Sequence, residues 1–222
     1  MNLKNKLASY LESTLLTPVA LKKDIGKLCQ DALVYKFAAV CIHPTYITLA
    51  ASLLQGSTIH VVTVVGFPLG ANDLSIKVQE ALLAVKNGAT EIDMVINIGA
   101  LKNGDMELIR REVSAVAECG VPIKAIIETG YLTKEEIIQA CSCIKEGGAH
   151  FVKTCTGFGP RGVLLEDILL IRAHLPSTMG IKAAAGIKSI SFTRELIDAG
   201  ATRIGTSAAE TIIKQADNVE IR

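Results

Sequence analysis

The sequence contains few aromatic residues and no tryptophan, and this scarcity limits the kind of core that the chain can build. Aromatic residues make up 4% of the 222 residues, whereas half of the chain is hydrophobic. The core must therefore consist mainly of isoleucine, valine, leucine and alanine, the residue types favoured where helices cover both faces of a parallel sheet. This composition favours the α/β class.

An excess of charge of either sign is also missing. The chain has 23 basic and 22 acidic residues, which give a formal net charge of +1, and the two signs are interspersed. A nucleic-acid or membrane surface normally needs a concentration of basic residues, so we expect neither partner. Lys4, Lys6 and Glu12 interrupt the apolar residues near the N-terminus, which resembles neither a signal peptide nor a spanning helix. A cytoplasmic, soluble protein is expected.

Cysteine and histidine spacings typical of metal sites are absent from the sequence. The six cysteines include no CxxC pair, and the four histidines show neither HxH nor HExxH spacing. We therefore expect no metal site. The cysteines are interpreted as buried free thiols in a reducing compartment.

Short runs of β-branched residues alternate with longer segments of helical periodicity. The predicted strands cover residues 11–15, 38–42, 60–65, 91–96, 122–128, 151–154, 181–184 and 203–205. The predicted helices cover residues 21–35, 44–55, 74–87, 105–119, 134–146, 166–174, 189–198 and 208–216. Gly88 and Gly120 stand where a helix would end, and Thr133 with Glu136 forms a capping box.

Eight strands, each followed by a helix, predict a (β/α)8 TIM barrel with a short helical extension at the N-terminus. An open, doubly wound sheet is the alternative. No linker, low-complexity tract or change of composition divides the chain. We therefore expect residues 1–222 to form a single domain, with its chemistry at the carboxyl ends of the strands.

Four predicted strands carry a charged residue between apolar neighbours. Asp93, Lys124, Lys153 and Lys182 are separated by 31, 29 and 29 residues, about one βα unit each, so they should occupy matching positions in consecutive units. Because adjacent residues of a strand point to opposite faces, the apolar neighbours should face the helices and the charges should point inward. A single lysine would more often be an edge residue whose ammonium group reaches solvent. Four such residues together indicate a site at the barrel mouth.

Clustered lysines suggest a particular chemistry. A protonated ammonium group cannot attack a carbonyl carbon, whereas a neutral amine can. Burial and a neighbouring cation both lower the pKa of a lysine from its reference value of about 10.4, which prepares a Schiff-base nucleophile. On this reasoning Lys153 and Lys182 are nearly interchangeable as the nucleophile, and Asp93 would accept and donate protons.

Glycine-containing turns follow the last three predicted strands, at Thr156-Gly157, Ala185-Gly186 and Gly205-Thr206-Ser207. Backbone N–H groups at a helix start favour a phosphate, and barrel enzymes often bind one after strands seven and eight. Lys188 adds a nearby cation. Ordinary turns would have the same composition, so this candidate anion site is the weaker of the two signals.

The chain resembles the deoxyribose-phosphate aldolase family over almost its whole length. The motifs that carry the resemblance are STLLTP, AAVCIHP, TVVGFPLG, EIDMVINIGALKNGD, IKAIIETGYLT, FVKTCTGF, IKAAAGIK and RIGTSAA. The resemblance implies a (β/α)8 barrel that reversibly cleaves 2-deoxy-D-ribose 5-phosphate to acetaldehyde and D-glyceraldehyde 3-phosphate without a metal or an organic cofactor. It also implies sugar-phosphate and aldehyde substrates and a homodimer or homotetramer.

The same resemblance implies a role for each candidate residue. Lys153 corresponds to the Schiff-base lysine, Lys182 to the second lysine that lowers its pKa, and Asp93 to the aspartate of the proton relay. Five further residues match positions associated with the phosphate: Gly157, Gly186, Lys188, Gly205 and Ser207. The supporting candidates are Lys124, Cys41 and Glu12.

Several positions depart from the usual family pattern. Glu12-Ser13 stands in place of Asp-His, Ala185 in place of a glycine, Lys188 in place of an arginine and Cys155 in place of a serine. Some members end in tyrosine, whereas this chain ends in Glu220-Ile221-Arg222. Cys41 and Cys155 could bring a thiol close to the aldehyde. The alternatives are another Schiff-base sugar-phosphate aldolase, a transaldolase, and a barrel that binds a sugar phosphate without catalysis.

Overall fold

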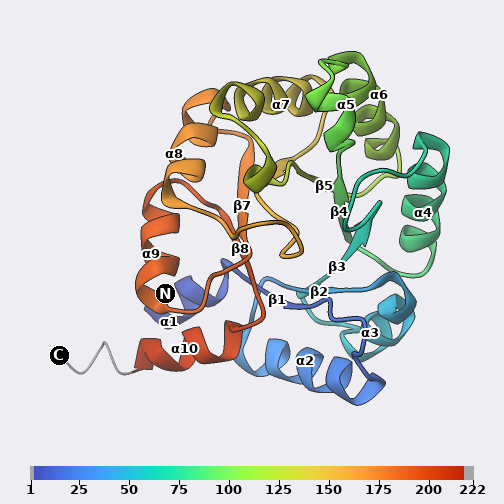
Figure 1. Cartoon of the computed structure of the whole chain (residues 1–222). Helices are drawn as coiled ribbons and strands as arrows, with labels where there is room; N and C mark the ends of the chain where they lie inside the picture. Colours follow the sequence, from blue (N-terminus) through green and yellow to red (C-terminus); the bar gives the residue numbers. More distant parts are fainter. Residues whose placement is uncertain (1–2, 218–222) are drawn as a thin grey trace.

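Eight parallel strands form a closed barrel inside a ring of helices in the computed structural model, which describes residues 3–217 (Figure 1). Each strand pairs with the next along the chain, and β1 closes the barrel by pairing with β8. This topology confirms the predicted (β/α)8 barrel. A short helix, α1, precedes the barrel as expected and packs against the last helix, α10. The C-terminal Glu220-Ile221-Arg222 lies outside the described residues.

The strands are β1 (Leu11–Leu15), β2 (Ala39–Ile42), β3 (His60–Val65), β4 (Glu91–Val95), β5 (Ile123–Ile126), β6 (Phe151–Lys153), β7 (Gly180–Ala184) and β8 (Arg203–Thr206). The helices are α1 (Leu3–Ala8), α2 (Lys22–Tyr35), α3 (Ile47–Leu53), α4 (Leu74–Lys86), α5 (Ile98–Lys102), α6 (Met106–Ala117), α7 (Lys134–Glu146), α8 (Leu165–His174), α9 (Ile190–Asp198) and α10 (Ala209–Asp217). Two 3₁₀ turns are η1 (Pro44–Tyr46) and η2 (Thr129–Tyr131).

Helix ends follow the predicted signals. The Thr133 side chain accepts a hydrogen bond from the Glu136 N–H at 3.3 Å, and the Glu136 carboxylate accepts one from the Thr133 N–H at 2.7 Å. This reciprocal pair confirms the capping box at the start of α7. Gly88 and Gly120 follow α4 and α6 with φ of 108° and 87°, a region that side chains disfavour.

The structure differs from the sequence expectation in three connections. The helix expected at residues 44–55 is divided into η1 and α3. The strand expected at residues 122–128 ends at Ile126, because Glu128 turns the chain with a left-handed φ of 51°. Helix α5 was not expected, and it begins where the Asn97 side chain accepts a hydrogen bond from the Ala100 N–H.

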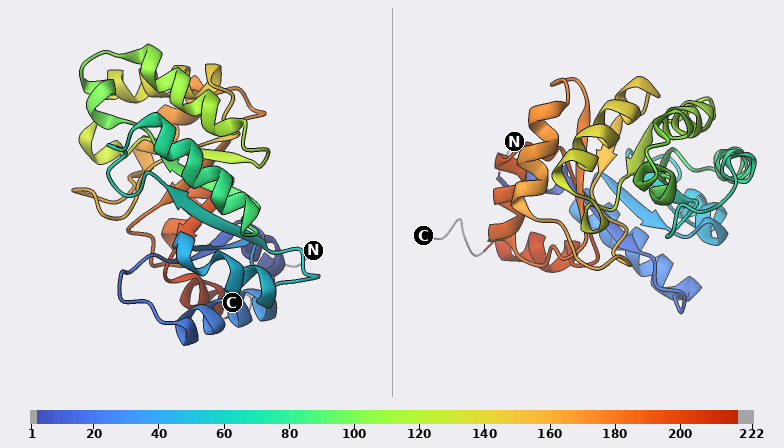
Figure 2. Two further views of the ribbon diagram at one scale, coloured as in Figure 1. Left: turned by 90° about the vertical axis from the view of Figure 1, so that its right-hand side faces the viewer. Right: turned by 45° about the horizontal axis from the view of Figure 1, so that its top comes forward.

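On six of the eight strands, β1 and β4 to β8, the two faces differ in polarity. Outward-facing residues such as Ile92, Met94 and Val152 are fully buried beneath the helices and form the main aliphatic core. The side views in Figure 2 show this outer ring of helices around the strands. Inside the barrel, β2 and β3 contribute small apolar side chains, whereas β1 and β4 to β8 contribute charged ones. Among residues 3–217, no helix has the length and apolar composition needed to cross a bilayer.

Candidate active site

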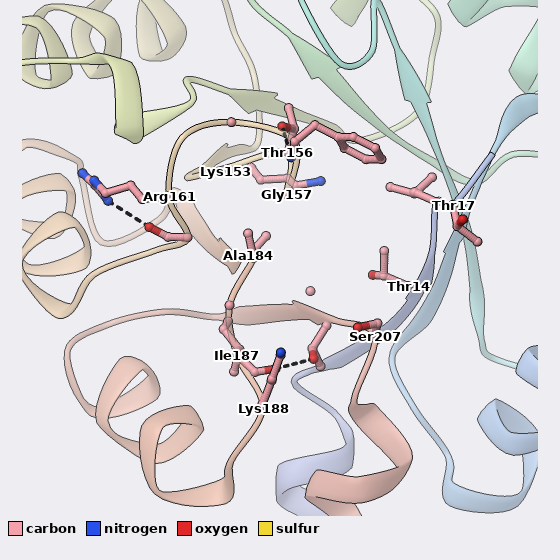
Figure 3. Close-up of a pocket in the computed structure, with 18 of the residues that line it drawn as sticks. Thr14, Thr17, Lys153, Thr156, Gly157, Arg161, Ala184, Ile187, Lys188 and Ser207 are labelled. Carbon is pink, nitrogen blue, oxygen red and sulfur yellow. Dashed lines mark hydrogen bonds between the residues drawn. The ribbon is translucent and has the colours of Figure 1, made fainter. Parts of the chain in front are cut away.

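A cavity of about 480 Å³ opens at the carboxyl ends of β1, β6, β7 and β8 (Figure 3). Lys153, the last residue of β6, lines it, and its amino group points into the open space across from Thr14 and Thr17. Neither Asp93 nor Lys182 is among the residues that line this cavity. Of the four charged strand residues, Lys153 is thus the one that a ligand in the cavity can reach.

Asp93 lies behind Lys153 and joins three lysines. Its Oδ2 accepts hydrogen bonds from Lys153 Nζ at 2.8 Å and from Lys182 Nζ at 2.6 Å, and its Oδ1 is 3.2 Å from Lys124 Nζ. Burial alone would raise the pKa of Asp93, but the three ammonium groups outweigh burial and hold this pKa well below its usual value. Asp93 is therefore an ionised acceptor at neutral pH.

Lys182 is shared between two buried carboxylates. Its ammonium group donates to Asp93 and to Glu12 Oε2. Burial alone would lower the pKa of Lys182, yet the two carboxylates raise it above its usual value. Burial raises the pKa of Glu12, but Lys124 and Lys182 together lower it by more, so this pKa lies below its usual value. Lys182 consequently remains a cation at neutral pH and is poorly suited to attack a carbonyl carbon.

Lys124 lies deeper in the barrel than Lys153. The strand register aligns Lys153 with Lys182, but it aligns Lys124 with Phe151, two residues before Lys153. The four charged residues therefore do not occupy strictly matching positions, as the spacing had suggested, because the register shifts between β5 and β6. Lys124 Nζ lies 2.5 Å from Glu91 Oε2 without a hydrogen bond of regular geometry. Burial lowers the pKa of Lys124, but the surrounding carboxylates raise it by more, so this pKa lies above its usual value.

Arg203 and Glu91, neither of which was predicted from the sequence as a site residue, complete the charged interior. The Arg203 guanidinium is 3.4 Å from Glu12 Oε1 and 3.4 Å from Glu91 Oε1. Glu91 stands two residues before Asp93 and so points to the same face of β4. Strand alternation could therefore have placed Glu91 inside the barrel. Glu91 and Arg203 are each the first residue of their strand, however, where a charged side chain is ordinarily exposed to solvent.

All five residues predicted to bind phosphate line the cavity: Gly157, Gly186, Lys188, Gly205 and Ser207. Gly157 and Gly186 have φ of 90° and 80°, a conformation that costs side-chain-bearing residues about 1 kcal/mol or more. Ala185 adopts the same region with φ of 75°. The alanine found in place of the family glycine thus keeps the left-handed turn, at the expense of some strain.

Glu128 and Thr156 hold the loop that follows Lys153. Glu128 Oε2 accepts hydrogen bonds from both the N–H and the hydroxyl group of Thr156, and the Phe158 N–H donates to that hydroxyl at 3.0 Å. Phe158 lines the cavity and meets Phe67 edge to face, with ring centroids 5.4 Å apart. Glu128 was not predicted from the sequence, although a glutamate at a buried strand end was a usable signal, and Thr156 was predicted only as part of the Thr156-Gly157 turn.

Arg161 anchors the far end of the same loop. Its guanidinium pairs with the Asp167 carboxylate through contacts of 2.6 Å and 3.0 Å. A further bond to the Gly162 carbonyl oxygen is drawn in Figure 3. Although Arg161 lines the cavity, these bonds occupy its guanidinium group.

Cys41 and Cys155 are fully buried, and neither lines the cavity. The Cys41 thiol is 3.8 Å from Asp93 Oδ2. Burial raises the pKa of both thiols to about 11. Within residues 3–217, no group of three or more histidine, cysteine, aspartate or glutamate side chains is arranged to hold a metal ion.

Comparisons with known proteins identify a family of aldolases. The model of the DeoC/LacD family of aldolases matches residues 11–211. A deoxyribose-phosphate aldolase from Thermoanaerobacter sp. (strain X514) is 44% identical over 220 residues, covering 97% of this chain and 99% of the relative. One from Aciduliprofundum boonei is 48% identical over 213 residues, covering 94% and 96%. The solved tetrameric deoxyribose phosphate aldolase from Aeropyrum pernix superposes with a TM-score of 0.89 at 28% identity, covering 97% of this chain and 93% of that one.

Proposed function

Because the chain belongs to the DeoC/LacD family of aldolases, we propose that it reversibly cleaves 2-deoxy-D-ribose 5-phosphate to acetaldehyde and D-glyceraldehyde 3-phosphate. The observation that carries the proposal is the position of Lys153. Its amino group enters the cavity while Asp93, 2.8 Å away, and Lys182 lie behind it. A buried lysine beside a second cation and open to a ligand is the arrangement that a Schiff-base nucleophile needs.

Lys153 starts the reaction as a neutral amine. Its nitrogen bonds to C1 of the open-chain sugar phosphate and gives a carbinolamine. The hydroxyl group of this carbinolamine takes up a proton through the proposed Asp93 relay and leaves as water, so that an iminium ion remains. The ammonium group of Lys182 favours the neutral form of Lys153, because the two groups share one Asp93 oxygen and repel each other when both are charged.

The iminium ion then accepts the electrons of the C2–C3 bond. As the C3 hydroxyl loses its proton, C3 becomes the aldehyde carbon of glyceraldehyde 3-phosphate and an enamine stays on Lys153. Addition of a proton at C2, followed by hydrolysis, releases acetaldehyde and restores the amine. Asp93 is the proposed proton-relay group. Because its pKa is held so low, Asp93 can accept a proton only when a neighbouring cation loses its charge.

The glycine turns after β6, β7 and β8 provide the proposed phosphate site. Gly157 and Gly186 have no side chains that would keep a phosphate from the backbone N–H groups, and Lys188 supplies a cation. Gly205 lies within β8, where the lack of a side chain makes room for Lys182. Since these residues and Lys153 line the same cavity, the phosphate would direct C1 toward the amine. Binding energy from this remote group then serves to orient the reacting carbon.

The decisive experiment traps the covalent intermediate. The protein is incubated with acetaldehyde and sodium borohydride, and the reduced adduct is located by mass spectrometry. We expect an ethyl group on Lys153, together with acetaldehyde release from 2-deoxy-D-ribose 5-phosphate in a coupled assay. Lys153→Met is the matched control and should give neither signal.

Other outcomes point to other functions. An adduct on Lys182 alone would contradict the proposed nucleophile. A Lys153 adduct without cleavage of this sugar phosphate would indicate a different Schiff-base aldolase or a transaldolase, which product analysis would identify. No adduct at all would favour a barrel that binds a sugar phosphate without catalysis.

We also propose that the whole chain acts as one catalytic domain, in the cytoplasm and as a homodimer or homotetramer. All six cysteines are free thiols, as a reducing compartment favours. Leu82 and Leu83 on α4 and Leu69 in the segment between β3 and α4 are exposed large apolar residues, and the Aeropyrum pernix relative is tetrameric. Light scattering after size-exclusion chromatography tests the assembly, and a monomer at micromolar concentration would contradict it.

A further inference from the structure

A second cavity, of about 590 Å³, lies at the opposite face of the barrel, where β6, β7 and β8 begin. Lys145, His150 and Arg203 line it. The Arg203 side chain is 18% exposed, yet its guanidinium contacts Glu12 and Glu91 inside the barrel. A cation on the far face therefore belongs to the same ionic cluster as Lys153.

This cluster is not balanced in charge. Among the described residues it contains four basic groups, on Lys124, Lys153, Lys182 and Arg203, and three carboxylates, on Glu12, Glu91 and Asp93. When every group is ionised, the interior holds one positive charge in excess. An excess charge is costly in a buried site, and the loss of one proton from a lysine removes it.

The contacts indicate which lysine loses that proton. Lys153 has one carboxylate within ion-pair distance, Lys182 has two and Lys124 has three. Arg203 cannot lose its proton under protein conditions. Lys153 also borders the substrate cavity, so that its proton can leave to solvent. The balanced state of the interior is therefore the state in which Lys153 is a neutral amine.

We propose that Arg203 and Glu91, on the far side of the barrel from the substrate, set the pH at which Lys153 becomes a nucleophile. Both act as positioning residues through the shared ionic cluster. Loss of the Arg203 charge removes the excess, so Lys153 keeps its proton to a higher pH. Loss of the Glu91 charge enlarges the excess, so Lys153 releases its proton at a lower pH. The inference rests on Lys153 being the nucleophile of the proposed function.

Replacement of Arg203 or Glu91 leaves the other titratable side chains around Lys153 in the sequence. Asp93, Lys124 and Lys182 face it from β4, β5 and β7, Glu12 and Cys41 lie on β1 and β2, and Lys188 lies across the cavity. The β3 residues beside this cluster, Val62 and Val64, are apolar. His60 Nδ1 is 3.7 Å from Glu91 Oε1, so His60→Gln serves as a separate control for histidine titration.

The test measures the protonation of Lys153 without relying on aldolase activity. Lys153 is methylated with formaldehyde and cyanoborohydride at a series of pH values, and its labelling rate is measured by mass spectrometry. Arg203→Gln should move the midpoint of the rate profile up by about one pH unit and Glu91→Gln should move it down by a similar amount. The double variant should return close to the original midpoint. Where the chain cleaves the sugar phosphate, the acidic limb of kcat/KM should move in the same directions.

Two controls isolate the effect of charge. Arg203→Lys keeps the charge and should keep the midpoint. Lys145→Gln removes a cation from the same far cavity, where the structure shows no contact with the cluster carboxylates, and should also leave the midpoint unchanged.

Unchanged midpoints in both single variants, or shifts of the same sign, would overturn the inference. If Arg203→Gln fails to fold, Glu91→Gln decides alone, because a packing defect has no reason to lower the midpoint. Failure of the proposed function has a different signature. The acetaldehyde–borohydride experiment would then yield no Lys153 adduct, while the methylation midpoints could still be measured.

Discussion

The barrel contains one buried ionic cluster, and a second buried ion pair lies outside it between α4 and α6. Lys77 Nζ donates to Glu112 Oε2 at 2.5 Å and to the Val95 carbonyl oxygen at 3.0 Å, and Glu112 Oε1 accepts from the Asn97 N–H at 2.6 Å. Both side chains are almost fully inaccessible. This pair has equal and opposite charges, and both carboxylate oxygens are hydrogen-bonded.

The barrel cluster differs from this pair in three respects. It holds more basic groups than acidic ones, it borders a cavity through Lys153, and Lys124 Nζ, Glu91 Oε2 and Asp93 Oδ1 lack hydrogen bonds of regular geometry. Burial is common to both sites and so does not mark function. Unequal charge next to a ligand-sized space is the feature that separates a reactive site from a structural one.

Replacing the nucleophile should give the largest contrast between the two sites. Lys153→Met removes the amine that forms the Schiff base, so we expect cleavage to fall by at least about 10⁴-fold. The same change leaves three basic groups and three carboxylates in the interior, the balanced state at any pH, so the free energy of unfolding should stay level or increase. A coupled acetaldehyde assay and urea denaturation measure the two effects. Retained cleavage would disprove the role of Lys153, and marked destabilisation would contradict the charge argument.

Replacing the lysine of the ion pair outside the barrel should reduce stability without affecting the chemistry. Lys77→Met leaves the Glu112 carboxylate buried without its counterion, which should lower the free energy of unfolding by about 3–5 kcal/mol. Lys77→Met with Glu112→Leu should recover much of this loss, because no unpaired charge remains. Urea denaturation at pH 7 measures both variants, and borohydride trapping should still label Lys153 in the folded protein. A loss below about 1 kcal/mol for the single variant would mean that water reaches the pair.

The second lysine of the cluster should affect the pH dependence of activity more than the fold. Lys182→Leu keeps the nucleophile but removes the cation beside it, so Lys153 should stay protonated near neutral pH. We expect about a 10²-fold loss of kcat at pH 7 that shrinks as the pH rises. The pH profile of kcat provides the measurement. A loss of the same size at every pH would point to misplacement of Asp93 instead.

The fold could be predicted from the sequence, whereas the contacts of the reactive residues could be predicted only in part. The alternation of strands and helices and the inward direction of Asp93, Lys153 and Lys182 follow from local periodicity, which neighbouring residues determine. The ion pairs of Arg203 with Glu12 and Glu91 depend on barrel closure and on the register between distant strands. Sequence spacing also could not reveal that Lys124 lies deeper than Lys153, because the register shift at β6 is a tertiary feature. Lys182 is in register with Lys153 yet does not line the cavity, a difference that spacing could not predict either.

Glu128 is a buried carboxylate that shares features with both ionic sites, because only one of its two oxygens is hydrogen-bonded. It is buried and forms no ion pair within residues 3–217. One of its oxygens accepts two hydrogen bonds from Thr156, and the other has no hydrogen-bond partner among these residues. Glu128→Gln should loosen the loop that presents Gly157, so we expect KM for 2-deoxy-D-ribose 5-phosphate to rise about tenfold. The activity toward 2-deoxy-D-ribose, which has no phosphate, should change less than about twofold.

Steady-state kinetics with the two sugars test this role. Glu135→Gln, an exposed change at the start of α7, is the matched control and should leave both sugars unaffected. An equal loss for both sugars in Glu128→Gln would show that the residue supports the whole site rather than the proposed phosphate loop.

The buried thiols should respond least of all. Cys41 lies 3.8 Å from Asp93 and Cys155 directly follows the loop residue Thr154, yet both are fully buried and their pKa values are raised to about 11. At pH 7 only about one thiol in 10⁴ is then the reactive thiolate. The rate of inactivation by acetaldehyde should therefore change less than about twofold in a Cys41→Ala, Cys155→Ala double variant. A markedly longer half-life would show that the aldehyde reaches these thiols. Burial would then protect the thiols from reaction less well than it keeps solvent from the balanced Lys77–Glu112 pair.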